Sequence, residues 1–147
     1  MRSYKQFFIE KNVFGLEELI HLDGIGRLKS KLDTGNGAFN VLHGTDIQSD
    51  GKLVRFTTEN GVSVEKPVQD MIVINIGAGN TEERPVVLFD LKIGNKIFKN
   101  IPFSIGNREE NNHKVLIGKN FIQNELDALI DVGLTNVAGK NLEADYD

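Results

Sequence analysis

Four turn signals divide much of the chain into short stretches in which apolar and polar side chains alternate. Each pairs Gly with Asp or Asn, residues that tolerate positive φ at little cost. They are Asp23-Gly24, Asp50-Gly51, Asn60-Gly61 and Gly94-Asn95. Between two of them, Val54 and Phe56 alternate with Arg55 and Thr57, which is the period of a strand with one buried face. Short strands at this spacing predict an all-β sandwich or barrel-like domain.

Two hairpins and one helix can be located in this pattern. We expect the first hairpin from residues 16–22 and 25–32, and another from residues 86–93 and 96–105. Residues 119–124, directly after a glycine, predict a short helix.

The expected organisation is one domain with two extensions. A chain of 147 residues is long enough for a single core and too short for two domains of ordinary size. We place the domain at residues 14–136, after an N-terminal arm (1–13) that could be helical or extended. A polar, acidic tail (137–147) follows it.

Composition excludes several kinds of chemistry and partner. The sequence has no Cys, so disulfides, thiolate metal sites and a Cys nucleophile are excluded. A formal net charge of −4 argues against binding to nucleic-acid phosphates. No apolar segment reaches membrane-spanning length, and Glu10 interrupts the apolar patch near the N-terminus before it could act as a signal-peptide core. We therefore expect a cytoplasmic protein with neither nucleic-acid nor membrane partners.

The tripeptide Asp33-Thr34-Gly35 is the strongest candidate for a chemical site. It follows the alternating segment 27–32, so Asp33 would lie where a strand leaves the sheet, and Gly35 would allow a sharp turn. Alone, the tripeptide favours a plain strand-terminating turn. A distant apolar-apolar-Gly element, Leu116-Ile117-Gly118, makes the pair look like the two halves of an aspartic-peptidase site.

That chemistry needs two carboxylates almost in contact. Like charges so close cannot both ionise, so the pair holds one proton: one member activates a water and the other polarises the scissile carbonyl. The chain contains the Asp-Thr-Gly tripeptide once. A catalytic pair therefore requires a second copy of the chain, with the two Asp33 side chains meeting across a two-fold axis.

Further motifs follow in order along the chain. They are Arg84-Pro85-Val86-Val87, Asn107-Arg108-Glu109, and residues 115–122 followed by Ile130-Asp131. With residues 27–43, they resemble the retropepsin-like aspartic peptidases. Within that superfamily the likeness is greatest to the so-called ATP-dependent zinc protease family associated with ribosomal-modification ATP-grasp ligases. The matches run from about Phe14 to Asn136, most of the chain.

The resemblance implies a closed or barrel-like retropepsin-like β domain with one short C-terminal helix. It also implies a homodimeric aspartic peptidase, without a cofactor, that hydrolyses peptide or glutamate-containing amide bonds. In that role Asp33, Thr34 and Gly35 are catalytic, with Thr34 locking the loop through its hydroxyl. Leu116-Ile117-Gly118 would be the structural element beneath the active loop.

Substrate-binding residues are also implied. A flap over the substrate would come from the hairpin around Asn60-Gly61 or, with a slight preference, from residues 76–80, which include Gly77 and Gly79. A plain surface loop is the alternative. Arg84 and Arg108 match family positions and could bind a substrate carboxylate, with structural ion pairing as the alternative.

Two further points stay open in the sequence. His43 matches a family histidine and is a weak candidate metal ligand, but no His-x-x-x-His spacing is present, so we predict no metal and a hydrogen-bonded structural histidine. Residues 36–39 depart from the family pattern. They motivate a competing hypothesis, a catalytically silent structural or assembly module, for example in a virion among neighbouring structural proteins. A noncatalytic peptide-binding domain is a third possibility.

Overall fold

The computed structural model describes residues 12–34, 39–126 and 128–135. Most of the expected N-terminal arm, the acidic tail and Gly35 lie outside these residues. Within them, no helix is long and apolar enough to cross a membrane.

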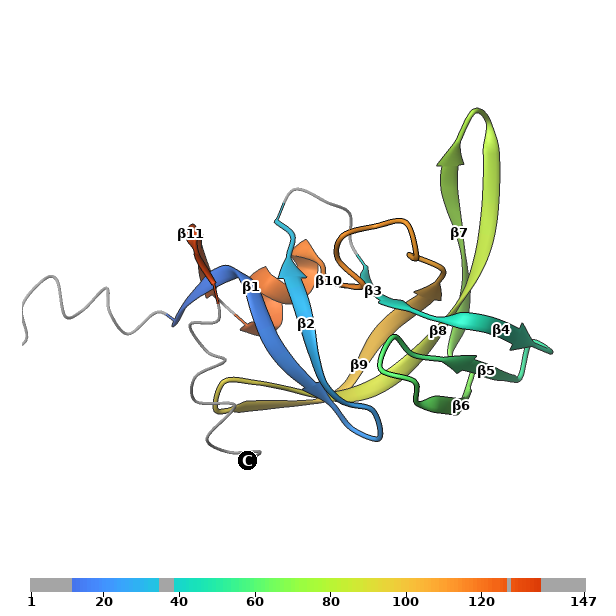
Figure 1. The fold of residues 1–147 in the computed structure, drawn as a ribbon, viewed down its shortest axis with the longest axis horizontal. Coiled ribbons are helices and arrows are strands. Elements are labelled where there is room, and N and C mark those ends of the chain that lie inside the picture. The colour runs from blue at the N-terminus through green and yellow to red at the C-terminus, as the bar shows by residue number, and fades with distance from the viewer. Residues whose placement is uncertain (1–11, 35–38, 127, 136–147) are drawn as a thin grey trace, which may run out of the picture.

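The described chain is built almost entirely from strands, with one short helix near its end (Figure 1). In order these are β1 (Asn12–Leu22), β2 (Gly26–Leu32), β3 (Asn40–His43), β4 (Thr45–Ser49), β5 (Leu53–Thr57), β6 (Ser63–Pro67), β7 (Asp70–Gly77), β8 (Asn80–Ile93), β9 (Lys96–Gly106), β10 (Val115–Ile117), the helix η1 (Phe121–Leu126) and β11 (Ala128–Thr135).

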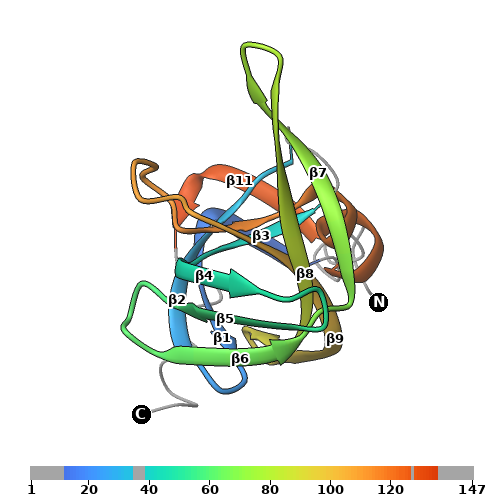
Figure 2. The same cartoon turned by 90° about the vertical axis from the view of Figure 1, so that its right-hand side faces the viewer.

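Most strands belong to one mixed sheet that closes on itself. Its order is β11-β1-β2-β10-β3-β9-β8-β7, and an additional antiparallel pairing joins β1 to β8 through Ile20↔Ile93 and Leu22↔Leu91. The ring therefore runs through β1, β2, β10, β3, β9 and β8, while β4, β5 and β6 form a small separate sheet beside it (Figure 2). The all-β, barrel-like prediction is confirmed.

The inner face of the ring and the facing side of the small sheet enclose one apolar core. Phe89 and Phe103 are both fully buried and meet edge to face, with ring centroids 5.9 Å apart. The predicted alternation of β5 is also confirmed, because Val54 and Phe56 lie in this core while Arg55 between them is exposed.

The predicted turns and hairpins are present. The four Gly-containing turns connect β1 to β2, β4 to β5, β5 to β6 and β8 to β9. The predicted helix at 119–124 also forms, but it extends further. Lys119 and Asn120 are helical, Ile122 donates its backbone N–H to Gly118 O at 3.1 Å, and η1 continues to the buried Leu126. Burial of that leucine accounts for the extra residues.

One hairpin projects from the body of the molecule. β7 and the first part of β8 extend beyond the ring and end in a tight turn at Ala78-Gly79 (Figures 1 and 2). Gly77, Ala78 and Gly79 have φ values of 99°, 52° and 77°, the left-handed conformations that a two-residue hairpin turn requires. Val73 and Ile76 on this arm are 64% and 54% exposed, so the arm has little packing of its own.

Candidate active site

The Asp33 loop begins where β2 leaves the ring, as the sequence predicts. β10 lies parallel to β2, with Ile117 opposite Leu32, and the backbone N–H of Asp33 donates to Ile117 O at 2.9 Å. This bond brings the Leu116-Ile117-Gly118 turn directly beside Asp33. Two segments more than 80 residues apart in sequence thus form one structural unit.

The side chain of Asn40 stabilises this unit through two hydrogen bonds. Its side chain is 5% exposed, its Oδ1 accepts from the backbone N–H of Gly118 at 2.7 Å, and its Nδ2 donates to Pro102 O at 3.1 Å. Asn40 therefore joins the strand that follows the Asp33 loop to the glycine turn and to β9. Sequence reasoning missed this residue, because an Asn next to a glycine-rich loop carries the same signal as a turn residue.

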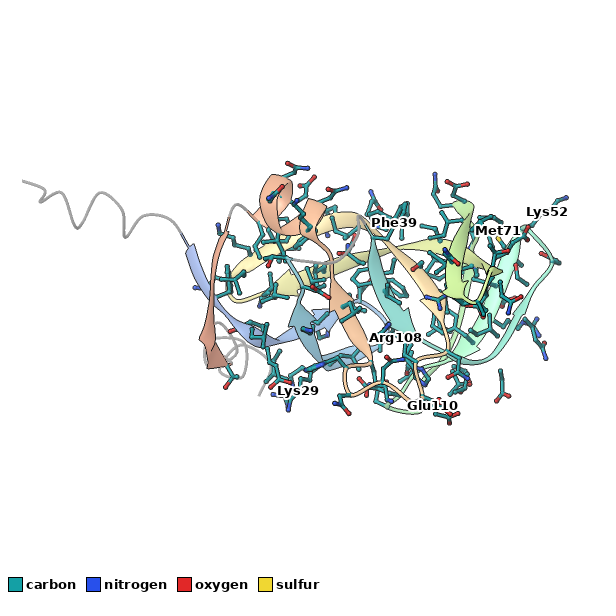
Figure 3. All side chains as sticks on the ribbon, turned by 90° about the horizontal axis from the view of Figure 1, so that it is seen from above. Lys29, Phe39, Lys52, Met71, Arg108 and Glu110 are labelled. Atoms are coloured by element: carbon teal, nitrogen blue, oxygen red, sulfur yellow. The ribbon has the colours of Figure 1, made fainter. Side chains whose placement is uncertain are left out.

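An open pocket of about 400 Å³ lies beside Asp33. Among the described residues, its lining consists of Lys31, Asp33, Arg108, Asn111, Asn112, His113 and Leu116. In this part of the lining the partly buried carboxylate of Asp33 lies with the cationic side chains of Lys31 and Arg108. A larger hollow of about 510 Å³ lies elsewhere, between β9 and η1 with Phe39 on its rim, and does not include Asp33. Figure 3 shows Phe39 and Glu110 on opposite sides of the molecule, with Arg108 between them.

Arg108 is held at this pocket by two hydrogen bonds. Its backbone N–H donates to Nδ1 of His43 at 2.8 Å, and its Nε donates to His113 O at 2.9 Å. Burial lowers the pKa of Arg108, and the charge of Arg84 acts in the same direction, while the Asp33 carboxylate opposes them. The charges of both arginines and of Asp33 therefore act within one small region. Because Nε already donates to His113 O, the two terminal nitrogens of the Arg108 guanidinium are the atoms that can bind a ligand.

Arg84 approaches the same region from β8. The guanidinium group packs against the backbone of Gly106. A Cβ added to Gly106 would lie 2.7 Å from Arg84 Cζ, so this contact requires glycine at position 106. Arg84 Nε also donates to Glu82 Oε2 at 2.6 Å. The side chain is 14% exposed. Arg84 thus has a structural ion pair and, through its electrostatic effect on Arg108, a place near the pocket.

His43 is a buried, hydrogen-bonded residue. It is 4% exposed, and burial lowers its pKa, helped by the charges of Lys114 and Arg108 and opposed by Glu109. The bond from the Arg108 N–H requires an unprotonated Nδ1, so the neutral imidazole carries its proton on Nε2. Among the residues that the structure describes, no group of three or more His, Asp or Glu is arranged to hold a metal ion.

The two flap candidates differ in how they are anchored. The turn at Asn60-Gly61 belongs to the small sheet, and Asn60 Nδ2 donates to Ile25 O at 3.1 Å, which ties it to the ring. Gly77 and Gly79 lie at the tip of the projecting β7–β8 hairpin. The second segment has the shape and exposure that a flap needs. Its movement stays a prediction.

The predicted catalytic roles of Asp33, Thr34 and Gly35 depend on a second copy of the chain. Thr34 is exposed at the start of the loop, and Gly35 lies outside the described residues. No other Asp-Thr-Gly occurs in the sequence, so the roles of Asp33 and Thr34 in a carboxylate pair stay predictions.

A closed β ring in which an Asp-Thr-Gly strand end meets an apolar-apolar-Gly turn is the architecture of a retropepsin-like aspartic peptidase. Residues 13–141 match the RimB-like family, described as the retropepsin-like aspartic endopeptidase RimB. The chain belongs to this family. The superfamily resemblance inferred from the motifs is therefore confirmed.

Two relatives illustrate what the chain is similar to. A crystal structure of a Legionella pneumophila protein of unknown function (DUF785) superposes with a TM-score of 0.70 at 29% identity, covering 86% of this chain and 98% of that one. A Desulfotalea psychrophila protein named as a probable alpha-L-glutamate ligase is 26% identical over 153 aligned positions, which cover 94% of this chain and 32% of the relative. The chain spans about a third of that relative's length.

Proposed function

We propose that this protein is a homodimeric aspartic endopeptidase that cleaves peptide or amide bonds beside glutamate residues. The observation that carries the proposal is the sharing of one pocket by Asp33, Arg108 and Lys31. A carboxylate suited to activating water thus lies next to cations suited to holding an acidic side chain. Membership of the RimB-like family supports the reaction class.

The reaction would use Asp33 from each of two chains. The pair holds one proton; the ionised carboxylate takes a proton from a water, and the resulting hydroxide adds to the carbonyl carbon of the scissile bond. The protonated partner donates its proton to the carbonyl oxygen. The tetrahedral intermediate then collapses as its C–N bond breaks: the amide nitrogen receives a proton from the pair, and one hydroxyl of the intermediate returns its proton to the pair, which leaves the carboxylic acid product and the pair with one proton again. The exposed position of Thr34 beside Asp33 is compatible with contact to a second copy.

The substrate class follows from the charges around the pocket. Arg108 can present its two terminal nitrogens to a carboxylate in the planar, two-pronged geometry that guanidinium groups favour. Lys31 adds a second positive charge to the lining. The Desulfotalea relative, which contains a segment similar to this chain, is named as a probable alpha-L-glutamate ligase, and this supports a substrate rich in glutamate.

The first test compares wild-type protein with Asp33→Asn on oligoglutamate and oligoglutamine peptides from mildly acid to neutral pH, with products identified by mass spectrometry. We expect cleavage of the acidic peptide, reduced by roughly 10²–10⁴-fold in the variant. Asp23→Asn, in the exposed turn between β1 and β2, is the matched control and keeps full activity. Undiminished cleavage by Asp33→Asn rules the mechanism out. Peptide binding without turnover by the wild type points to the noncatalytic alternative.

A mixing experiment tests the shared site directly. When wild-type chains exchange with an equal amount of Asp33→Asn chains, only dimers of two wild-type chains stay active, so activity per wild-type chain falls to about half. A site complete within one chain predicts no change. Sedimentation of the active species measures the oligomer independently.

A further inference from the structure

Lys114 fills a cage of main-chain oxygens in the 108–111 turn, from which Arg108 and Asn111 line the pocket. Its ammonium donates to the carbonyl oxygens of Arg108, Glu109 and Asn111 at 2.9, 2.7 and 2.7 Å. An ammonium group has three donors, and here each has its own carbonyl. All three donors are therefore taken by the protein's own backbone, and the Lys114 charge also acts on the carboxylate of Glu59, whose pKa burial raises and Lys114 lowers. Lys114 lies within two residues of the pocket-lining Leu116.

The caged turn is the one that carries Arg108. The backbone N–H of Asn111 donates to Arg108 O at 2.9 Å, so the turn closes on the same oxygen that Lys114 holds. On its other side, the Arg108 N–H is bonded to His43. The main chain of Arg108 is thus held at both its N–H and its C=O, and Asn111 from the same turn lines the pocket.

We propose that Lys114 is a positioning residue: its ammonium acts as a built-in cation that fixes the 108–111 turn and so aims Arg108 at the Asp33 pocket. The effect on catalysis rests on the proposed function, because it assumes that Arg108 binds a substrate carboxylate. The effect on the conformation of the 108–111 turn is independent of the proposed function. Removal of the ammonium leaves three converging carbonyl oxygens, a set that suits a monovalent cation.

Lys114 could instead act only by attracting an acidic substrate with its charge. Substitution by arginine distinguishes this charge role from the positioning role. Arginine keeps the charge, but its planar fork cannot direct three donors from one nitrogen at carbonyls that converge on a point. Positioning therefore predicts that Lys114→Arg behaves like Lys114→Ala. A pure charge role predicts that Lys114→Arg behaves like the wild type.

The experiment measures kcat and KM on an oligoglutamate peptide together with hydrogen exchange of the Arg108 amide. For Lys114→Ala we expect KM to rise roughly tenfold with a much smaller change in kcat, since the turn that aims Arg108 is displaced. The Arg108 amide should lose protection in the same variant. Addition of n-butylammonium, which resembles the missing side chain, should restore both in a saturable manner, whereas tetramethylammonium at equal ionic strength, which has no N–H, should not.

Lys66→Ala is the matched control. Its ammonium also donates to a backbone carbonyl, Leu88 O at 2.6 Å, but it lies over the Phe89 ring rather than on the Arg108 turn. KM and Arg108 exchange should stay unchanged in this variant. If Lys114→Ala does not fold, Lys114→Met keeps the aliphatic stem and takes its place for the measurements of KM and Arg108 exchange, without the n-butylammonium rescue, because the Met side chain fills the space that n-butylammonium would enter.

Two results would overturn the positioning role: a wild-type KM in Lys114→Arg, or unchanged Arg108 protection in Lys114→Ala. Absence of cleavage by the wild-type protein would instead remove the proposed function. In that case amide exchange and its rescue by n-butylammonium still decide whether Lys114 holds the turn.

Discussion

The backbone N–H of Arg108 donates a 2.8 Å hydrogen bond to Nδ1 of His43, a residue 65 positions away in the sequence. The imidazole is buried, and the bond exists only while Nδ1 is unprotonated. The protonation state of one core histidine is therefore linked to the place of an arginine at the pocket.

This link predicts a loss of stability in mild acid. Burial lowers the pKa of His43 below its ordinary value of 6.5, so the unfolded chain takes up a proton more readily than the folded one. The stabilising contribution of the neutral imidazole is complete above pH 6.5 and is lost as the pH falls through the lower folded pKa. NMR titration of the His43 ring, with denaturant unfolding across this range, measures both effects. In His43→Gln the decline should be shallower; an equally steep decline would assign it to other groups.

Asn40 should contribute to stability through the glycine turn. Asn40→Ala leaves the backbone N–H of Gly118 without its side-chain acceptor in a buried place. We expect a loss of about 1–3 kcal/mol in the free energy of unfolding. Gln123→Ala on the exposed side of η1 is the control and should change little. Equal unfolding free energies for Asn40→Ala and the wild type would show that the Asn40 bonds contribute nothing net.

Local sequence patterns predicted several of the strands but not the closure of the ring. Alternation and Gly-containing turns located β5 and the hairpins, because these signals act over a few residues. The pairing of β1 with β8 joins Ile20 to Ile93 and Leu22 to Leu91. These residues belong to two separate hairpins, and nothing in either segment specifies the other. Only the resemblance to a closed fold predicted that these edges meet.

The candidate site was likewise predicted only in part from the sequence. The Asp33 tripeptide and the Leu116-Ile117-Gly118 turn carry short motifs, and the structure joins them through the bond between Asp33 N and Ile117 O. Asn40 and Lys114 were missed. Each acts through hydrogen bonds to backbone carbonyls or N–H groups. Because almost every residue carries the same backbone groups, the sequence does not show which residues such a side chain will bind.

The tip of the β7–β8 hairpin should respond to substitution in opposite directions. Ala78 has a φ of 52°, a left-handed conformation that costs a residue with Cβ about 1–2 kcal/mol. Ala78→Gly should therefore strengthen the hairpin, and Gly79→Ala, at a φ of 77° with no neighbouring atom within 4 Å, should weaken it. Hydrogen exchange of the β7 amides measures the local effect. A change of the same sign in both variants would contradict the backbone argument.

Gly106→Ala should impair binding of an acidic substrate with little loss of stability. The added Cβ would meet the Cζ and Nε of Arg84 at 2.7 Å. This is the far end of a flexible side chain, which can swing away. Arg84 would then leave its place near Arg108, and we expect KM for an oligoglutamate peptide to rise by roughly three- to tenfold while kcat changes less. Steady-state kinetics and chemical denaturation of the same sample give the two quantities.

Gly44→Ala supplies the contrast, because its Cβ would meet the core rather than the pocket. The nearest atoms are Ile105 Cγ2 at 2.9 Å and Phe56 Cδ2 at 3.0 Å, both on buried side chains that cannot swing into solvent. Overpacking of this kind costs about 1–3 kcal/mol, so this variant should lose stability. If Gly106→Ala instead loses as much stability as Gly44→Ala and keeps a wild-type KM, then Arg84 is a structural residue and has no part in binding substrate.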